Sequence, residues 1–433
     1  MQVSVENVGT LGRKLTVKIP ADRLESQISE RINKMGRTVR LKGFRPGRVP
    51  PQIIKQRFGA QVRGETLSEM INESMREAFE QEKLQPVAQP SIDTTGEPAD
   101  DGEIACTASF EVMPEFPEID VSELAIERPH AEVVEADIDA MIETLRKQRR
   151  HFEPVERAAQ ADDFVTFKYA ASVGDYRFPE EGREQGSCVL GTGALFEALE
   201  NVVSGQKPGA EVSADIEFPA DFGNENLAGR KAAVELNIDK VQEPQLPELD
   251  ETFIKQFGVE DGDMDTFRDD VRSNLERELE GALTAALKSE VAEKLADAYP
   301  DLDVPEVMVD NEIRGLLRDQ LPEGQEIPAE ARKAALPMAR KRVAAALLMG
   351  EIARKQELEL DRKRVAQFMS VIASTYEEPE KVIELYSQDP QLMQGLQNRV
   401  MEDQVAEWVA EHAQTTDKSL SFDDVMRRGQ GQA

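Results

Sequence analysis

The sequence predicts an α+β chain of several domains: an N-terminal α/β unit, a small β-rich domain and a long, almost purely helical region. Its 433 residues are too many for one ordinary core, and this length alone suggests about two to four domains. Strand-like alternation of apolar residues opens the chain and returns over 162–243, where glycine is frequent. From about residue 265, apolar residues instead recur at helical spacing.

The N-terminal unit spans residues 1–113. Period-2 alternation predicts two strands, after which Pro20 opens a helix. A short helix and a longer one are predicted between residues 53 and 79, and a last strand over 104–112. Cys106 alternates with polar residues in that strand, so we expect it on the core face. The apolar residues of the first two strands are Val3, Val5, Leu15, Val17 and Ile19.

The β-rich domain lies between a helix and a linker. Residues 135–151 carry a helical apolar stripe, which residues 151–157 interrupt. Strand signals follow within 162–243, in FVTFKYAASV and AAVELNIDKV. The two prolines of VQEPQLPEL, residues 241–249, indicate a linker out of this domain.

One apolar stripe dominates the start of the helical region. On an α-helix each four-residue step advances about 400°, so the stripe precesses by roughly 40° per step. We therefore expect different neighbours to pack at its two ends. Its members are Phe267, Val271, Leu275, Leu279, Leu283, Leu287, Val291 and Leu295. Further helices are predicted near 303–321, 328–356, 361–375 and 390–413.

The chain is strongly acidic, with 84 Asp or Glu, 52 Lys or Arg and a formal net charge of −32. Such a charge disfavours non-specific binding to nucleic acid or to an anionic membrane. The start of the chain lacks a secretory signal pattern, and the longest apolar run, residues 343–349, is far too short for a membrane span. Cys106 and Cys188 form neither a disulfide framework nor a zinc-site spacing. We expect a soluble cytoplasmic protein without a DNA or membrane partner.

A basic window interrupts this acidity. Residues 31–64 contain no Asp or Glu and ten Lys or Arg, so the local field suits phosphate or an acidic protein patch. Its centre, RLKGFRPGRVPPQ, combines turn-forming glycines with stiffening prolines and places Phe44 beside Arg45. We interpret it as a docking loop with an apolar anchor. The alternative is a solvated basic loop whose Phe44 is tucked into the core.

The segment GFRPGRVP resembles the GFRxGKxP signature of the trigger factor family of bacterial ribosome-associated chaperones, with Arg48 for the usual Lys. MQVSVE at the start and residues 246–262 and 382–393 also resemble that family, and the resemblance covers the whole chain. It implies that Phe44, Arg45 and Arg48 dock on the large ribosomal subunit beside the polypeptide exit tunnel. The ribosome-binding residues it implies are Gly43, Phe44, Arg45, Pro46, Gly47, Arg48, Val49 and Pro50.

The resemblance also implies an architecture. Residues 1–113 would be the α/β ribosome-binding domain. An FKBP-like β-rich domain, residues 150–245, would be inserted into an elongated all-helical substrate-binding domain. That domain would comprise a linker and helical arm, residues 114–149, packed with residues 246–433.

The inserted domain implies peptidyl-prolyl cis-trans isomerase activity. A prolyl amide has a rotation barrier of ~18–20 kcal/mol, and an apolar pocket favours its twisted form because that form has less charge separation. The resemblance places Tyr169, Phe178 and Phe222 in this pocket and residues 218–230 in the loop that closes over it. The alternative is that the three aromatics are plain core residues.

Much of the family's pocket pattern is absent. Lys168 stands at the family's acidic position, and Val234 replaces an aromatic on the last strand. Cys188 replaces the aromatic before the Val-Leu pair, and residues 196–199 read FEAL in place of an Ile-Pro-Gly-aromatic turn. We therefore predict weak or absent turnover.

The helical region shows no catalytic constellation. It has no P-loop, and His130, His151 and His412 are too far apart to indicate a metal site, so we expect neither cofactor nor metal. Met-, Leu- and Ala-rich helices suit variable partners, although ordinary helix packing must explain most of these residues. Trp408 is expected in the core.

Three functions are compatible with the sequence. The leading one, which the resemblance implies, is an ATP-independent chaperone that binds nascent chains at the exit tunnel. Its partners would be ribosomal protein and rRNA, nascent and unfolded polypeptides, and a second copy of the chain off the ribosome. The alternatives are a prolyl isomerase acting off the ribosome and a helical scaffold without clients.

Overall fold

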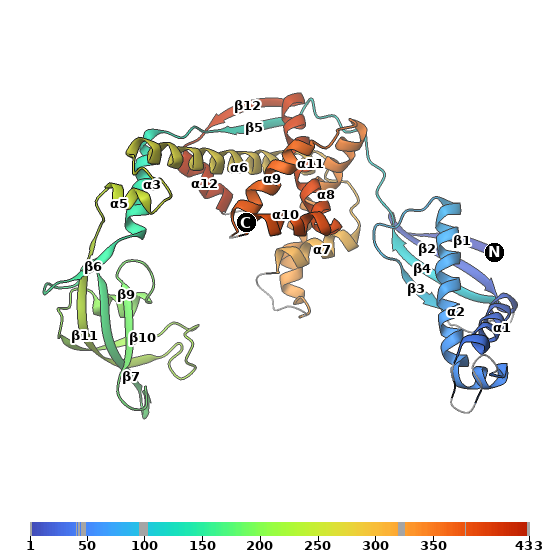
Figure 1. The fold of residues 1–433 in the computed structure, drawn as a ribbon, viewed down its shortest axis with the longest axis horizontal. Coiled ribbons are helices and arrows are strands. Elements are labelled where there is room, and N and C mark those ends of the chain that lie inside the picture. The colour runs from blue at the N-terminus through green and yellow to red at the C-terminus, as the bar shows by residue number, and fades with distance from the viewer. Residues whose placement is uncertain are drawn as a thin grey trace. The chain divides into compact units, whose positions relative to one another are not determined.

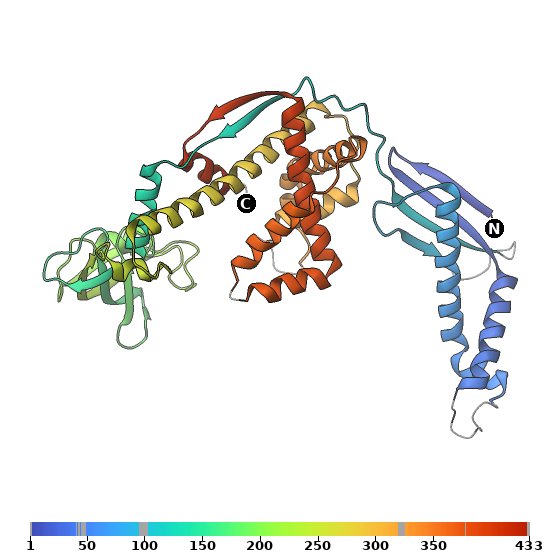
Figure 2. The same ribbon diagram turned by 45° about the horizontal axis from the view of Figure 1, so that its top comes forward.

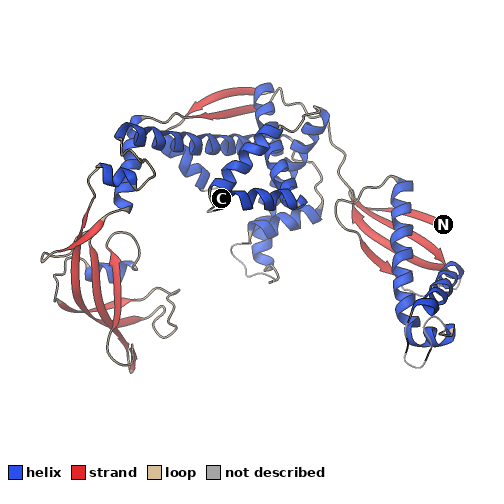
Figure 3. Ribbon diagram, viewed as in Figure 1, coloured by secondary structure: helices blue, strands red, loops and turns tan. Residues whose placement is uncertain are grey.

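The computed structural model (Figure 1) describes most of the chain, namely residues 2–39, 41, 44, 49–94, 103–318, 325–376 and 378–430. The chain divides into two compact units, which are described separately. Unit 1 comprises residues 1–130, 282–420 and 424–433, and unit 2 comprises residues 131–281 and 421–423. Figure 3 shows how helices and strands are distributed along the chain.

Unit 1 begins with a four-stranded antiparallel sheet in the order β1-β2-β4-β3, against which two helices pack. The core lies between sheet and helices, and the fully buried Cys106 confirms the predicted core face of its strand. Leu15 on β2 pairs with Ala108 on β4, so both contribute to this face. The elements are β1 (Gln2–Val8), β2 (Gly12–Pro20), α1 (Ala21–Thr38), α2 (Pro51–Glu82), β3 (Ser91–Thr94) and β4 (Glu103–Glu111).

Helix α2 corrects one prediction. The short and the longer helix expected between residues 53 and 79 form a single helix of 32 residues. Gly59 and Gly64 lie inside it, and each costs about 1 kcal/mol relative to alanine in a helix interior. The buried stripe from Ile54 to Ala78 outweighs that cost, because its residues all face the same core.

The rest of unit 1 is mostly helical. The predicted helices near 303–321, 328–356, 361–375 and 390–413 are confirmed as α7 (Glu306–Leu316), α8 (Ala329–Lys355), α9 (Arg362–Ser374) and α11 (Pro390–His412). The structure adds α10 (Pro379–Gln388) and α12 (Phe422–Gln430), of which α12 continues from unit 2. It also adds a parallel ladder of β5 (Ala125–His130) and β12 (Gln414–Ser419), which the sequence analysis did not predict.

Unit 2 contains the β-rich domain. Its sheet has the order β10-β11-β7-β8, with β6 added to β11 and β9 added to β7. Residues 241–245, expected as part of a linker, instead end β11, and residues 242–245 pair with β6. The elements are α3 (Glu135–Gln148), β6 (His151–Pro154), β7 (Phe164–Val173), β8 (Tyr176–Phe178), β9 (Glu184–Val189), α4 (Glu197–Val203), β10 (Glu211–Glu217), β11 (Lys231–Gln245) and α5 (Glu251–Lys255).

The apolar stripe lies on one long helix, α6 (Met264–Ala298). At its N-terminal end, residues 267–275 pack with Ile138 of α3 and Phe253 of α5. At its other end, residues 287–295 pack in a separate core with residues of β5, α8 and α11. The prediction that the two ends have different neighbours is therefore confirmed.

Candidate functional site

The loop between α1 and α2 is fixed by apolar contacts at both of its ends (Figure 2 shows the two helices side by side). Val49 is 5% exposed, and Leu41 packs against the same core. Gly36 of α1 admits this packing, since a Cβ there would lie 3.2 Å from the Val49 carbonyl oxygen. The Phe44 N–H donates to the Leu41 carbonyl at 3.1 Å.

Phe44 is 40% exposed, so its ring is not tucked into the core. This exposure disagrees with the alternative of a buried Phe44. Pro50 lies at the start of α2 as its N-cap. The other predicted ribosome-binding residues, Gly43, Arg45, Pro46, Gly47 and Arg48, lie outside the described residues.

Four cations flank this loop, and all four side chains are exposed. They are Lys34 and Arg37 near the end of α1 and Lys55 and Arg57 near the start of α2. Within the described residues none of the four has an ion-pair partner. The first turn of α2 has no acidic residue either, so the positive end of its dipole is not neutralised there.

The two basic residues further from the loop differ. Arg31 donates to both oxygens of Glu69, one at 3.0 Å, and also pairs with Glu65. The hydrogen bond from Arg31 lowers the pKa of the Glu69 carboxyl. Arg63 pairs with Glu25. Uncompensated positive charge is therefore concentrated at the loop end of the helix pair, which we call the basic pole and define by Lys34, Arg37, Phe44, Lys55 and Arg57.

The predicted pocket aromatics of unit 2 fall into two groups. Tyr169 of β7 and Phe178 of β8 lie with ring centroids 6.4 Å apart. Phe222 belongs to a second group, 4.8 Å from Phe218 and 6.0 Å from Phe196. All three predicted residues are half-buried at the rim of the same core. Phe196 was not predicted as an aromatic of this pocket, because it stands in the altered FEAL segment.

Hydrogen bonding ties the 218–230 loop to β8, the strand that carries both Tyr176 and Phe178. The Asn224 side-chain amide donates to the Tyr176 hydroxyl at 3.2 Å. Burial raises the pKa of the Tyr169 hydroxyl, and the charge of Glu184 adds to this effect, so that hydroxyl keeps its proton at neutral pH. A protonated, half-buried hydroxyl beside aromatic rings can donate to a carbonyl oxygen.

The residues that depart from the family pattern lie in ordinary structural environments. Lys168 is exposed and pairs with Asp239 at 2.9 Å. Val234 is 1% exposed within the core. Cys188 is also buried, and burial together with the charge of Glu200 raises the pKa of its thiol to about 11. Relative to the family pattern, the acidic residue is thus replaced by a surface cation, Lys168, and two aromatic residues are replaced by the small core side chains of Cys188 and Val234.

Apolar side chains are exposed around α9, α10 and the start of α11. Helix α10 buries none of its residues. The small core beneath these helices contains only Val365, Leu396 and Val400 as buried members. We call the exposed set the arm patch, and it consists of Val371, Tyr376, Ile383, Leu385 and Leu392. Helix α10 was not predicted, because its ten residues are too few for a periodic apolar pattern to stand out.

The histidines and Trp408 have structural environments. Trp408 packs against the core that contains the end of α6, as expected, and its ring stacks on His412 at a centroid distance of 4.1 Å. Among the described residues, no group of three His, Cys, Asp or Glu side chains is placed to hold a metal ion. Within those same residues, no helix is long and apolar enough to cross a membrane.

Comparisons with known proteins cover nearly the whole chain. Family models match residues 1–145 ("Bacterial trigger factor protein (TF)"), 155–240 ("FKBP-type peptidyl-prolyl cis-trans isomerase") and 263–411 ("Bacterial trigger factor protein (TF) C-terminus"). A "Trigger factor" of Stenotrophomonas maltophilia (strain K279a) is 48% identical over 99% of this chain and 100% of its own length. A "Trigger factor" of Xanthomonas euvesicatoria pv. vesicatoria (strain 85-10) is 46% identical over the same shares. A solved structure described under "Promiscuous Substrate Recognition in Folding and Assembly Activities of the Trigger Factor Chaperone" shares 16% identity over 95% of this chain and 99% of its own, with a TM-score of 0.47.

Proposed function

Since this chain belongs to the trigger factor family and is a ribosome-associated chaperone with an FKBP-type peptidyl-prolyl isomerase domain, we propose that its basic pole is the point of ribosome attachment. The observation that carries this proposal is that Phe44 is exposed in the loop of a helix pair that also carries four exposed cations without an ion-pair partner among the described residues, in a chain of net charge −32. Arg45 and Arg48 supply further charge, and Phe44 supplies an apolar anchor. The surface that receives them is rRNA and protein of the large subunit beside the exit tunnel.

Co-sedimentation with vacant 70S ribosomes tests this attachment. We expect the triple variant Phe44→Ala, Arg45→Ala, Arg48→Ala to lose binding, and binding of the unaltered chain to weaken with added salt because salt screens exposed charge. A matched control removes one exposed aromatic and two exposed cations elsewhere, through Tyr376→Ala, Arg354→Ala and Lys381→Ala. Equal binding by the triple variant and the control would remove the docking assignment.

Client capture is assigned to the helical region of unit 1. We propose that the arm patch contacts apolar segments of nascent and unfolded polypeptides without ATP. Exposed apolar side chains cost solubility unless charge surrounds them, and the acidic composition of this region supplies that charge. The proposal is tested by comparing client binding by Tyr376→Ser, Leu385→Ser, which alters exposed residues, with client binding by the buried variant Leu396→Ala.

For the isomerase domain, we propose slow turnover through Tyr169, Phe178 and Phe222. The two aromatic groups can line an apolar site, but Lys168, Cys188 and Val234 do not supply the missing acid and rings. A proline-peptide assay on the full chain should give turnover well below that of an efficient FKBP-type enzyme. Comparable turnover would refute the proposal, and a Tyr169→Phe variant would then show whether the hydroxyl contributes.

The proposed domain organisation is 1–113 for ribosome binding, 150–245 for the inserted isomerase domain, and 114–149 with 246–433 for the substrate-binding body. It is supported by the core in which Val121, Leu124 and Ile126 pack with α6, α8 and α11. If limited proteolysis released 150–245 and left 114–149 unassociated with the C-terminal part, the organisation would be wrong.

We place the protein in the cytoplasm, with part of it bound to ribosomes. Sedimentation velocity in the absence of ribosomes will distinguish a monomer from a homodimer.

A further inference from the structure

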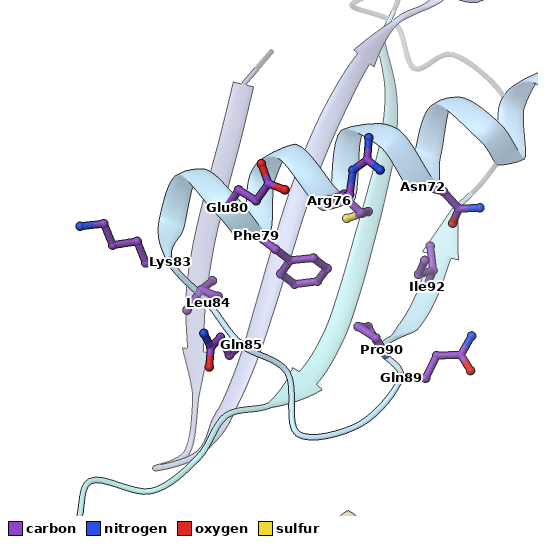
Figure 4. Close-up of a pocket in the computed structure, with 11 residues that line it drawn as sticks. Asn72, Arg76, Phe79, Glu80, Lys83, Leu84, Gln85, Gln89, Pro90 and Ile92 are labelled. Carbon is purple, nitrogen blue, oxygen red and sulfur yellow. The ribbon is translucent and has the colours of Figure 1, made fainter. Parts of the chain in front are cut away.

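A groove with a volume of about 700 Å³ lies on the N-terminal part of unit 1, away from the basic pole (Figure 4). Its apolar floor includes Met75, which is 3% exposed, and Phe79 of α2, whose ring packs edge-on against Phe110 with centroids 5.0 Å apart. The opposite wall is formed by Pro90 and Ile92, at the start of β3. This floor and wall are apolar surface that the fold itself leaves open.

Ile92 shows why the groove exists. It pairs across the sheet with Ala108 of β4, which is fully buried against the helices. Residues opposite each other in adjacent strands lie on the same face of a sheet, so Ile92 also lies on the helix-covered face. It is nevertheless 39% exposed. Helix α2 therefore covers the centre of the sheet and leaves the apolar face of its last strand open.

The main chain of β3 is the second feature of the groove. In the order β1-β2-β4-β3 this strand lies at the edge of the sheet. An edge strand directs part of its N–H and C=O groups away from its neighbour, where they can pair with an added strand. A groove between a helix and such an edge accepts an extended peptide: main-chain hydrogen bonds hold it, and alternate side chains enter the groove.

Polar side chains form the rim. Arg76 and Lys83 are exposed there together with one acidic residue, Glu80. Within the described part of the chain, neither cation has an ion-pair partner. Two cations against one carboxylate favour a guest that carries a negative charge beside its apolar residues.

We propose that this α2–β3 groove binds an extended segment of an unfolded client polypeptide as an added fifth strand beside β3. An apolar side chain of the client contacts Phe79 and Ile92, and a carboxylate two residues away lies beside Arg76. The inference rests on the proposed client-binding function and adds to it a site on the ribosome-binding domain. Main-chain recognition does not depend on the sequence of the guest, which suits unfolded clients. A second copy of the chain is a less suitable guest, because it would bring another net charge of −32 to the interface.

Fluorescence anisotropy with a defined probe tests the strand addition. The probe is a fluorescein-labelled octapeptide in which valine alternates with threonine and one valine is replaced by glutamate, so that the carboxylate lies two residues from a valine on the same face of the strand. Two further copies are N-methylated, one at the odd and one at the even amides, because methylation removes N–H donors from one edge of the strand only. We expect the full-length chain to bind the unmodified peptide and one methylated copy, and to bind the other at least tenfold more weakly. Equal binding of all three peptides, or no binding, would overturn the proposal.

Matched variants locate the site. Ile92→Glu should weaken peptide binding at least tenfold. Val5→Glu is the control, since Val5 is 36% exposed on the opposite edge strand and pairs with Leu15 on the same face of the sheet. Arg76→Glu should weaken binding of the glutamate peptide and strengthen binding of the same peptide with lysine instead. Circular dichroism melting will confirm that each variant is folded.

The remaining outcomes separate this proposal from the general chaperone function. If Tyr376→Ser, Leu385→Ser abolishes peptide binding and Ile92→Glu does not, the groove assignment is wrong and client binding by the arm patch stands. If Ile92→Glu changes only self-association in sedimentation velocity, the occupant is a second copy and the client assignment is overturned. If Ile92→Glu lowers affinity and Val5→Glu does not, the groove is the binding site.

Discussion

Residues 1–113 and the remaining 320 residues differ sharply in charge. The N-terminal part has 16 basic and 16 acidic residues, whereas the rest has 36 basic and 68 acidic residues and therefore carries the entire net charge of −32. A neutral domain does not attract rRNA by its net charge, so the arrangement of its charges must matter. In α2 the cations Lys55, Arg57 and Arg63 precede the acids, which begin at Glu65. One end of the domain attracts a polyanion, and the rest of the chain is repelled by it.

The largest expected effect comes from reversing the basic pole. Lys34→Glu, Arg37→Glu, Lys55→Glu and Arg57→Glu together should weaken ribosome binding by at least about 100-fold, or ~2.8 kcal/mol, and flatten its salt dependence. Quantitative co-sedimentation over a series of salt concentrations measures both. The control reverses four exposed cations of the acidic part that also lack ion-pair partners among the described residues: Arg314, Lys333, Arg362 and Lys363. An equal loss in the control would mean that net charge alone sets affinity.

The next largest effect concerns a buried ion pair in unit 2. Asp163 is 1% exposed, accepts the Gln160 N–H at 2.8 Å and pairs with both terminal nitrogens of Arg157. Asp163→Asn should lower the free energy of unfolding of this domain by about 1–3 kcal/mol, because it leaves buried hydrogen-bond partners poorly matched. Calorimetric unfolding of the full chain will show it. An unchanged unfolding transition in Asp163→Asn would mean that water replaces the hydrogen bonds that Arg157, which is partly exposed, makes to Asp163.

The same pair predicts a pH dependence. Burial raises the pKa of Asp163, but the hydrogen bonds from Arg157 and the Gln160 N–H outweigh it, and the pKa lies below the ordinary value. The stabilisation is therefore complete above an ordinary aspartate pKa of ~3.9 and is lost as the pH falls through the lower folded-state pKa. Below about pH 4, the unaltered chain should lose its stability advantage over Asp163→Asn. A constant difference down to pH 2 would contradict the assignment.

A smaller effect is expected at the arm patch. Tyr376→Ser, Leu385→Ser should weaken client binding several-fold, measured as the chain concentration that halves light scattering by a diluted denatured client. Unfolding should barely change, because both residues are more than half exposed. Leu396→Ala is the contrasting variant: this residue is 5% exposed, and its truncation should cost about 2–5 kcal/mol of stability. If Leu396→Ala weakened client binding and Tyr376→Ser, Leu385→Ser did not, the client site would lie elsewhere.

The smallest effect is expected where charge is already paired. Arg31→Ala removes an exposed ion pair with Glu69, and such pairs contribute little because solvent screens them. We expect an unchanged urea midpoint and only a small loss of ribosome affinity. If Arg31→Ala matched the effect of Arg37→Ala on co-sedimentation, pairing within the domain would not decide which cations face the ribosome.

Amphipathic patterns accounted for most of the fold. The strands β2 and β4 and the helix α6 were predictable because each buries apolar residues at a regular spacing, and such burial leaves a periodic trace in the sequence. Strand β1 shows the same alternation, although of its valines only Val3 packs against the core. Helix α10 and strand β3 are short and bury no residue, so their traces are weak. The β5–β12 ladder joins two short, mostly exposed segments whose pairing depends on distant helices. The predicted break within α2 was wrong, because residues on both sides of it pack against the same core.

The sites were predictable to different degrees. The acid-free window drew attention to the basic pole from composition alone, but only the fold shows that Arg31 and Arg63 are neutralised and that Lys34 and Arg37 are not. The pocket aromatics were placed by family resemblance, and their division into two groups, with Phe196 in one of them, depends on how the 218–230 loop packs. The α2–β3 groove left no signal in the sequence, because it results from where a helix stops covering a sheet.

The β5–β12 ladder has a consequence for how the protein itself is made. Lys418 on β12 pairs with Glu127 on β5, 291 positions earlier, and the core beside them also needs residues from α11. At roughly 5–20 residues per second, synthesis reaches β12 about 15–60 s after β5. The N-terminal domain, whose contacts close within residues 2–112, has no such wait. The proposed attachment domain can thus be completed long before the proposed client-binding body, whose core beside β5 stays incomplete until α11 and β12 have been synthesised.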